Sequence, residues 1–350
     1  MKQILYSCVV CIFCACQCQS GYIPEWHQEI RYDLDANNVS SVKSHEIVPF
    51  TRSLVHAKDF WVYKDSVLVV LNKPTADHFV EFYNINSEKC YAKVIRKGNG
   101  PGEMLNCNAR LNNCSLYVRD FVKGNYVVID IDEIIGCYGD DYKLEEFKPY
   151  REYVSAYDIH EISSEKHLYL NPYCFSSVVD GIDNKEPRFF YEGTWKPDMK
   201  KLNAYNVSQG HILVNERDSL ILFAGLDLNQ IEIYDYALNP LTKIVGPKNL
   251  HPRYSFHDGR VAFDKVAFYN YLGVCDAENG FYVTYSGEEI GKARGVYIFQ
   301  FDWTGNRIRS CFVNKYIATI SLSSDHRYIF ARGKDEDGSV VLYKLDLKGD

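Results

Sequence analysis

The segment Asp65-Ser66-Val67-Leu68-Val69-Val70 is a polar turn followed by a short apolar run, and this pattern occurs six times in the 350-residue chain. The apolar centres at residues 68, 116, 168, 220, 281 and 328 lie 47 to 61 residues apart. The other copies are Cys114-Ser115-Leu116-Tyr117-Val118, Lys166-His167-Leu168-Tyr169-Leu170, Asp218-Ser219-Leu220-Ile221-Leu222, Asn279-Gly280-Phe281-Tyr282-Val283 and His326-Arg327-Tyr328-Ile329-Phe330. A strand-containing repeat of roughly 40–50 residues is typical of a β-propeller.

Each copy is followed by a second strand-like run that ends in a polar turn, such as Ile231-Glu232-Ile233-Tyr234-Asp235. Alternation of apolar and polar residues predicts a strand with one buried face. Thr304-Gly305-Asn306 then leads into another alternating run, as in a hairpin. With a strand before each copy, such as Asp59-Phe60-Trp61-Val62-Tyr63, every repeat has four strands. We therefore predict an all-β fold, a six-bladed β-propeller with four-stranded blades.

The two ends of the chain predict how the ring closes. The sequence stops at Asp350, just after the third strand of the last repeat, so that this blade lacks an outer strand. Residues 45–50 precede the first blade and have no place within it. Pro49 has no N–H to donate, which an outermost strand tolerates best. We expect this N-terminal strand to complete the last blade, so that the propeller spans residues 44–350.

The N-terminus carries an export signal. Lys2 precedes a 12-residue apolar run from Ile4 to Ala15, which is too short to span a bilayer but suits a signal peptide. Small residues lie directly before Cys16, as in the lipobox of bacterial lipoproteins. We predict a signal peptide over residues 1–15, lipidation at Cys16 as the first mature residue, and a tether or wrapping segment over residues 16–43. Lipidation at Cys18 and a plain cleaved secretory signal are the alternatives.

The composition excludes several classes of function. A net charge of −7, from 46 acidic and 39 basic residues, argues against nucleic acid as a partner. No later stretch is long and apolar enough to cross a bilayer, so a lipid would be the only membrane anchor. Seven cysteines follow the signal region without a Cys-x-x-Cys pair, which excludes a zinc ribbon. We favour buried free thiols over disulfides, Cys107 with Cys114 being the nearest candidate pair.

One string links the chain to a known family. Arg96-Lys97-Gly98-Asn99-Gly100-Pro101-Gly102-Glu103-Met104 contains Gly-x-Gly-Pro-Gly-Glu directly after the first blade. This string, in a Cys-anchored propeller sequence, resembles the TolB-like six-bladed β-propeller lipoproteins of Bacteroides-type bacteria, over about residues 44–350. The resemblance implies an outer-membrane lipoprotein. The residues after Cys16 lack the acidic character that is usual for surface display, so both membrane leaflets stay open.

Two motifs resemble ligand loops but fit structural roles better. The glycines from Gly98 to Gly102 lack the Gly-Lys-Ser/Thr ending and the following helix of a nucleotide site. We interpret them as a crossing between blades where the backbone needs positive φ. The segment from Asp335 to Gly338 lacks the spacing of a calcium loop and is predicted to be a hairpin tip.

Two further residue pairs could carry chemistry. Asp130 and Asp132 place two carboxylates on one face of a predicted strand, the minimum for a hydrolase, but Asp132 falls at a turn that every repeat has. His251 and His257 lie in one loop without an identifiable third metal ligand. We therefore predict no catalytic set, no metal and no cofactor.

Basic residues recur where the chain crosses from the outer strand of one blade to the inner strand of the next. These crossings lie on one face, so their cations are predicted to attract an anionic ligand near the central channel. The candidate binding residues are Arg52, Arg96, Lys97, Lys148, Arg151, Lys201, Lys248, Arg253 and Lys315. Simple solvation of strand ends by Lys and Arg is the alternative explanation.

The sequence favours a non-enzymatic binding or interaction module at the cell envelope, whose partner would be an envelope protein or an anionic glycan or peptide. Two alternatives stay open. One is a carbohydrate-active lyase or hydrolase with its site at the channel mouth, which paired carboxylates or a His and Tyr pair would reveal. The other is a structural partner of an outer-membrane complex, which an exposed apolar patch would reveal.

Overall fold

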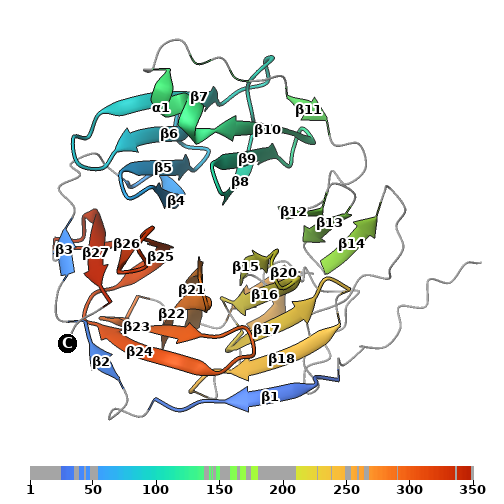
Figure 1. Ribbon diagram of the computed structural model, residues 1–350, viewed down its shortest axis with the longest axis vertical. Helices are drawn as coiled ribbons and strands as arrows, with labels where there is room; N and C mark the ends of the chain where they lie inside the picture. The colour runs from blue at the N-terminus through green and yellow to red at the C-terminus, as the bar shows by residue number, and fades with distance from the viewer. Residues whose placement is uncertain are drawn as a thin grey trace, which may run out of the picture.

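The computed structural model forms a ring of β-sheets arranged around a central axis (Figure 1). It describes residues 25–34, 39–42, 45–47, 54–137, 142, 144, 147–149, 158–163, 166–170, 175–179, 210–226, 228–237, 239–248, 254–257, 260–263, 268–289, 291–335 and 337–347. Within each blade the strands run antiparallel in chain order from the axis outward. Among these residues, no helix is long and apolar enough to cross a bilayer.

Five sheets have the four strands of a propeller blade, and we number them I to V in chain order. Blade I contains β4 (Ala57–Tyr63), β5 (Val67–Asn72), β6 (His78–Asn84) and β7 (Cys90–Arg96). Blade II contains β8 (Cys107–Asn112), β9 (Ser115–Asp120), β10 (Asn125–Asp130) and β11 (Lys148–Pro149), with α1 (Ile131–Gly136) after β10. Blade III contains β15 (Gly210–Asn215), β16 (Leu220–Gly225), β17 (Gln230–Asp235) and β18 (Pro240–Val245). Blade IV contains β21 (Phe268–Ala277), β22 (Gly280–Glu289), β23 (Val296–Phe301) and β24 (Arg307–Val313). Blade V contains β25 (Ile317–Leu322), β26 (Tyr328–Lys334), β27 (Val340–Asp346) and β3 (His45–Ile47).

The prediction of six blades is wrong: over the residues that the structure describes there are five four-stranded blades. Where the third blade was expected, β12 (Asp158–Ser163), β13 (Lys166–Leu170) and β14 (Phe175–Val179) form a three-stranded sheet among the described residues. The repeated turn-and-strand signal does form a strand there, β13. Such a signal marks one hairpin, however, and does not determine how many strands pair beside it. A separate hairpin, β19 (Tyr254–His257) and β20 (Arg260–Phe263), leaves the ring between blades III and IV.

Four of the six copies of the sequence signal share a backbone cause. The polar residue before the second strand adopts a left-handed conformation, with φ of 53° at Asp65, 52° at Asn113, 56° at Ser219 and 56° at His326. Polar residues such as Asn and Asp tolerate this region, and it suits the tight turns between antiparallel strands. The blade-to-blade core then forms from apolar residues on facing sheets, as between blades III and IV, where Leu222 and Phe281 lie in one buried cluster.

Ring closure by the N-terminal strand is confirmed over the described residues. β3 pairs antiparallel with β27, with His45 opposite Leu345 and Ile47 opposite Tyr343. Residues 48–50 lie outside the described residues. The last blade therefore takes its outer strand from the start of the chain, and this joins blade V to blade I without a disulfide.

Two more N-terminal strands wrap the outside of the ring, and together with β3 we call them the belt. β1 (Gln28–Arg31) pairs in parallel with β18 as a fifth strand of blade III, and β2 (Ser40–Ser41) pairs in parallel with β24 of blade IV. Figure 1 shows the belt passing along the outer edges of blades III, IV and V. Tyr32 fixes it by inserting its ring, 7% exposed, against Phe299, with the centroids 5.0 Å apart.

Candidate functional site

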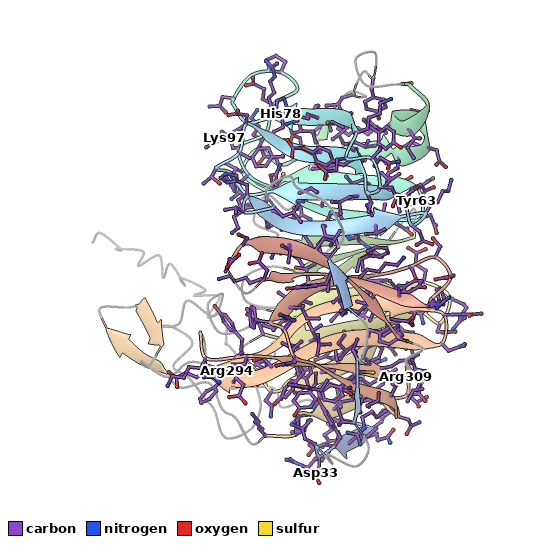
Figure 2. All side chains as sticks on the ribbon, turned by 90° about the vertical axis from the view of Figure 1, so that its left-hand side faces the viewer. Asp33, Tyr63, His78, Lys97, Arg294 and Arg309 are labelled. Carbon is purple, nitrogen blue, oxygen red and sulfur yellow. The ribbon has the colours of Figure 1, made fainter. Side chains whose placement is uncertain are left out.

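The ring has two chemically different ends, which Figure 2 shows from the side. The crossing face is the end at which the chain passes from an outer strand to the next inner strand, and Lys97 and His78 lie there. The turn face is the end with the turns between inner and second strands, and Tyr63 and Arg309 lie there.

The five predicted basic residues that the structure describes lie on the crossing face, but they are spread apart. Arg96 and Lys97 are exposed at the end of β7, and Lys148 is exposed on β11. Because β7 and β11 are outer strands, these three cations lie at the rim of the ring rather than at its axis. Arg52, Arg151, Lys201 and Arg253 lie outside the described residues.

The two remaining predicted cations are less available. Lys248 donates its Nζ to the carbonyl of Gly287 at 2.9 Å and to Oε1 of Glu288 at 2.5 Å, so a carboxylate already balances its charge. Lys315 lies half-buried in the short crossing into β25. Sequence position alone did not distinguish these environments.

The glycine string forms a compact crossing that is filled by its own glutamate. Oε2 of Glu103 accepts the Gly100 N–H at 2.8 Å, and a Cβ on Gly98 would lie 2.0 Å from the same oxygen. Lys123 holds the loop by donating to the carbonyls of Gly100 at 3.2 Å and Glu103 at 2.7 Å. Gly102 has a φ of 74°, as the predicted crossing requires, whereas at Gly98 a side chain would displace the Glu103 carboxylate.

The carboxylates of the pair after β10 make different hydrogen bonds. Asp130 ends the strand and caps α1, since its Oδ1 accepts the N–H groups of Asp132 at 2.8 Å and Glu133 at 3.2 Å. Asp132 pairs instead with Lys64 at 2.8 Å, and its pKa is lowered by the hydrogen bond from that ammonium. The expected strand therefore continues as a helix, and the two carboxylates have different structural partners. One ligand atom each of Cys114, Asp130 and Asp132 nevertheless lies within 4.8 Å of the others, as in a metal site.

The other sequence candidates have simple outcomes. Oδ1 of Asp335 accepts the N–H groups of Asp337 and Ser339, which confirms the hairpin tip between β26 and β27. His251 lies outside the described residues, and for His257 only the backbone of β19 is described. The cysteines whose side chains are described are free, but of the expected buried thiols only Cys107 and Cys311 are buried; the others are Cys90, Cys114, Cys137 and Cys275.

A different group of polar residues gathers at the axis on the crossing face. Inner strands β4, β21 and β25 each have a register irregularity near their first residues, between Ala57 and Asp59, between Tyr269 and Tyr271, and between Ile317 and Ile320. A β-bulge redirects side chains, and bulges are common at rims and beside active sites. Three consecutive blades, IV, V and I, are thus irregular at the same end of the axis.

The cations at this end come from within strands. Lys58, in the irregular stretch of β4, donates its Nζ to the carbonyl of Cys107 at 3.0 Å and to Oδ1 of Asn108 in blade II. Arg332 of β26 donates from Nη1 to the carbonyl of Ala57. Burial lowers the pKa of this guanidinium, and the nearby Asp59 carboxylate opposes that shift.

Two tyrosines complete the group, which we call the axial cluster: Lys58, Asp59, Asn108, Tyr269, Tyr316 and Arg332. Burial raises the pKa of Tyr316, with smaller electrostatic effects from Tyr269 and Arg332. The phenol therefore stays protonated at neutral pH.

His211 lies at the same end of β15, outside this cluster. The residue is half-buried but its ring is deeply placed, and burial lowers its pKa to about 4. The imidazole is neutral at physiological pH.

Sequence reasoning missed the axial cluster because it looked for cations in crossings. Lys58 and Arg332 lie within strands, where an alternating pattern predicts that charged residues face the solvent. A weak signal was present in Ala57-Lys58-Asp59-Phe60, where two charges in succession break the alternation before a buried residue. Two adjacent polar residues inside a strand are compatible with a bulge.

The turn face contrasts with this, because polar contacts there connect each of the five blades to its neighbour. Lys64 of blade I contacts Asp132 after blade II at 2.8 Å, and Asn112 of blade II donates to Glu216 of blade III at 3.0 Å. Arg217 of blade III donates to the Glu278 carbonyl of blade IV at 3.3 Å, and the Glu278 side chain lies 3.8 Å from His326 of blade V. The N–H of Ser324 in blade V donates to Asp65 of blade I at 2.7 Å.

Comparison with known proteins identifies the fold and no family. No protein-family model matches the chain, and no curated protein matches it in sequence. Its fold is similar to that of a Bacteroides fragilis protein described as exported, with 12% identity and a TM-score of 0.53 over 91% of this chain and 99% of the other. It is also similar to a DUF4221 family member from Bacteroides vulgatus, with 8% identity and a TM-score of 0.56 over 89% and 98% of the two chains. At such identities the likeness establishes the fold alone.

Proposed function

We propose that the protein is a non-enzymatic binding module of the cell envelope that holds an anionic ligand at the axial cluster. The observation that carries this proposal is Arg332 near Tyr269 and Tyr316, together with Lys58, which directly follows the Ala57 carbonyl that Arg332 contacts, where the inner strands are irregular. The only carboxylate in the cluster is Asp59, so the cluster is net positive on a chain with a net charge of −7.

The donor chemistry suits a carboxylated or sulfated glycan or a peptide carboxylate. A guanidinium has five N–H donors in a planar fork that matches a carboxylate, and Arg332 uses one nitrogen for the Ala57 carbonyl. Tyrosine rings add amphipathic contact surface with a polar end, which suits sugars and peptides. The exposed rim cations Arg96, Lys97 and Lys148 would extend contact with a longer anionic chain.

The enzymatic alternative has less support in this cluster. A lyase would need a base near the axis, yet Tyr316 is held protonated by burial, and His211 with a pKa of about 4 is a weak base. Among the described members of the cluster, Asp59 stands without a second carboxylate for a hydrolase pair. The third alternative, a structural partner of an outer-membrane complex, calls for an exposed apolar patch. The large apolar side chains that are exposed among the described residues are Val55, Val122 and Ile308.

The test is binding of uronate and sulfated oligosaccharides and acidic peptides to the Arg332→Gln and Lys58→Met variants. Loss of a charge-assisted hydrogen bond of about 1.5–3 kcal/mol predicts affinity lower by about 10- to 100-fold. Arg327→Gln is the matched control, because Arg327 directly precedes the same strand but pairs with Asp346 at 3.3 Å on the turn face. Equal affinity in all three variants would contradict the proposal, and release of cleaved product would favour the enzyme.

Export and lipid anchoring at Cys16 are part of the same proposal. They are supported by the apolar run before Cys16 and by the exported Bacteroides protein of similar fold. We also propose that the protein lies at the outer membrane and is a TolB-like propeller. Labelling of cells with a fatty-acid analogue should mark the protein, and Cys16→Ala should abolish the label. Retention of the label in Cys16→Ala with loss in Cys18→Ala would move the anchor to Cys18.

A further inference from the structure

We propose that Cys114, Asp130 and Asp132 form a binding site for a zinc ion on the turn face of blade II. One ligand atom from each of the three residues lies within 4.8 Å of the others. The site lies at the opposite end of the ring from the axial cluster. It goes beyond the anionic ligand of the proposed function, and neither proposal depends on the other.

Strand pairing brings the three residues together. Cys114 lies in the turn between β8 and β9, directly after Asn113, whose φ of 52° reverses the chain. Asp130 ends β10 opposite Ser115. The N–H of Ile131 donates to the Cys114 carbonyl at 2.8 Å, which ties the first residue of α1 to this turn. The thiol therefore meets the carboxylates through the register of a hairpin, and spacing along the chain does not indicate the site.

The Asp130 carboxylate is held with one oxygen directed at the thiol. Its Oδ1 accepts the N–H groups of Asp132 and Glu133, whereas its Oδ2 lies 3.8 Å from Sγ of Cys114. Zinc bonds are about 2.3 Å to sulfur and about 2.0–2.2 Å to a carboxylate oxygen, so two such ligands at a tetrahedral angle lie about 3.6 Å apart. The thiol and Oδ2 already have nearly this separation. Hydrogen bonds to the other oxygen are the usual support of a metal-binding carboxylate.

A cation from the neighbouring blade already contacts the third ligand. Nζ of Lys64 in blade I lies 2.8 Å from Oδ1 and 3.0 Å from Oδ2 of Asp132, and the Tyr63 hydroxyl donates to Oδ2 at 3.1 Å. The Asp132 side chain is 50% exposed, so an ion can reach it from solvent. One ammonium thus faces two carboxylates and a thiol. A divalent ion supplies the missing positive charge, and Lys64 can keep one oxygen of Asp132.

The donor set decides the class of ion. Thiolate ligands suit zinc and related transition metals, whereas Mg²⁺ and Ca²⁺ take oxygen ligands. The Cys114 thiol releases its proton to solvent when its sulfur binds the ion. Three protein ligands leave a fourth tetrahedral position, which a water molecule fills. The ion then joins the β8–β9 turn to the start of α1, and through Asp132 and Lys64 to blade I.

The test is titration of the full chain with Zn²⁺ in competition with a chromophoric chelator. We expect one zinc equivalent whose affinity falls by more than about 100-fold in Cys114→Ser and in Asp130→Asn, since loss of an outer-shell partner alone costs about 10- to 100-fold. Asparagine still caps α1, so Asp130→Asn reports the lost ligand rather than a lost helix. Cys137→Ser is the matched control, because it changes an exposed thiol at the other end of α1 and should leave zinc binding unaltered.

Two further measurements identify the ligands. Co²⁺ bound to the unaltered protein should show a thiolate-to-cobalt absorption band that Cys114→Ser lacks. Lys64→Met removes the ammonium that competes for Asp132, so zinc affinity should rise several-fold. Affinity that is unchanged or lower in Lys64→Met would contradict the place of Asp132 among the ligands. Equal zinc affinity in Cys114→Ser and the unaltered protein, a cobalt complex without the band, or displacement of zinc by an equal concentration of Ca²⁺ or Mg²⁺ would overturn the proposal.

Discussion

Replacing Glu232 by Gln should strongly change the pH dependence of stability. Glu232 is 2% exposed on the central strand β17, where its carboxylate accepts the Tyr234 hydroxyl at 2.6 Å and the Gln230 amide. Burial is the dominant influence and raises its pKa from 4.5 to about 7, although both hydrogen bonds oppose the shift. The folded protein therefore keeps a proton that the unfolded chain loses.

The sign follows from proton linkage. Between pH 4.5 and pH 7 the folded state binds more protons than the unfolded state, so stability falls as the pH rises through this window. At about 1.4 kcal/mol for each pKa unit, the full penalty at pH 8 is about 3 kcal/mol. Glu232→Gln removes the charge and keeps the shape. Relative to the unaltered protein, the variant should gain about 3 kcal/mol of stability between pH 4 and pH 8.

The assay is denaturant unfolding, followed by tryptophan fluorescence, of both proteins at intervals from pH 4 to pH 8. His211→Gln is the matched comparison, because burial lowers the pKa of that imidazole from 6.5 to about 4. The unfolded chain then binds more protons between pH 4 and pH 6.5, so this variant should gain stability relative to the unaltered protein as the pH falls. A pH-independent difference for Glu232→Gln would refute the reasoning, since it would mean that the carboxylate ionises normally in the folded state.

Three further substitutions test the structural argument by the free energy of unfolding. Tyr32→Ala should cost about 3–5 kcal/mol because it leaves a cavity under the belt, and Tyr32→Phe about 1 kcal/mol; equal effects would mean that the ring is not packed. Gly280→Ala should destabilise strongly, since its Cβ would lie 1.9 Å from the Phe301 carbonyl oxygen, whereas Gly136→Ala should be tolerated because nothing lies within 4 Å. Asp130→Ala should lose about 1 kcal/mol with the cap of α1, and Asp130→Asn should retain most of it.

Much of the fold could be predicted because its causes are local. The left-handed turn at residues such as Asp65 and Ser219 needs particular residue types, and alternation marks the strands beside it. Ring closure was predictable because the last repeat lacks a strand that residues 45–47 can supply. The number of blades was not, because the turn before Lys166 resembles the others while its sheet has three strands among the described residues.

The candidate site was less predictable, because it depends on pairing register. The crossings do carry cations, but whether a cation lies at the rim, like Lys97, or in an ion pair, like Lys248, depends on contacts between distant segments. Lys58 and Arg332 reach the axis because inner strands shift register, and register is fixed by the neighbouring strand rather than by the residue itself.

The two ends of the ring explain how an acidic protein can favour an anionic ligand. On the turn face, Lys64 contacts Asp132 and Arg217 contacts Asp218, so carboxylates balance these cations. On the crossing face, Arg332 donates to a carbonyl and Lys58 to a carbonyl and an amide, while the Asp59 carboxylate lies near Arg332. Local potential depends on unneutralised charge close by, because solvent ions screen charges beyond about 10 Å. The net charge of −7 therefore does not decide what binds at the axis, whereas the contacts of these two cations do.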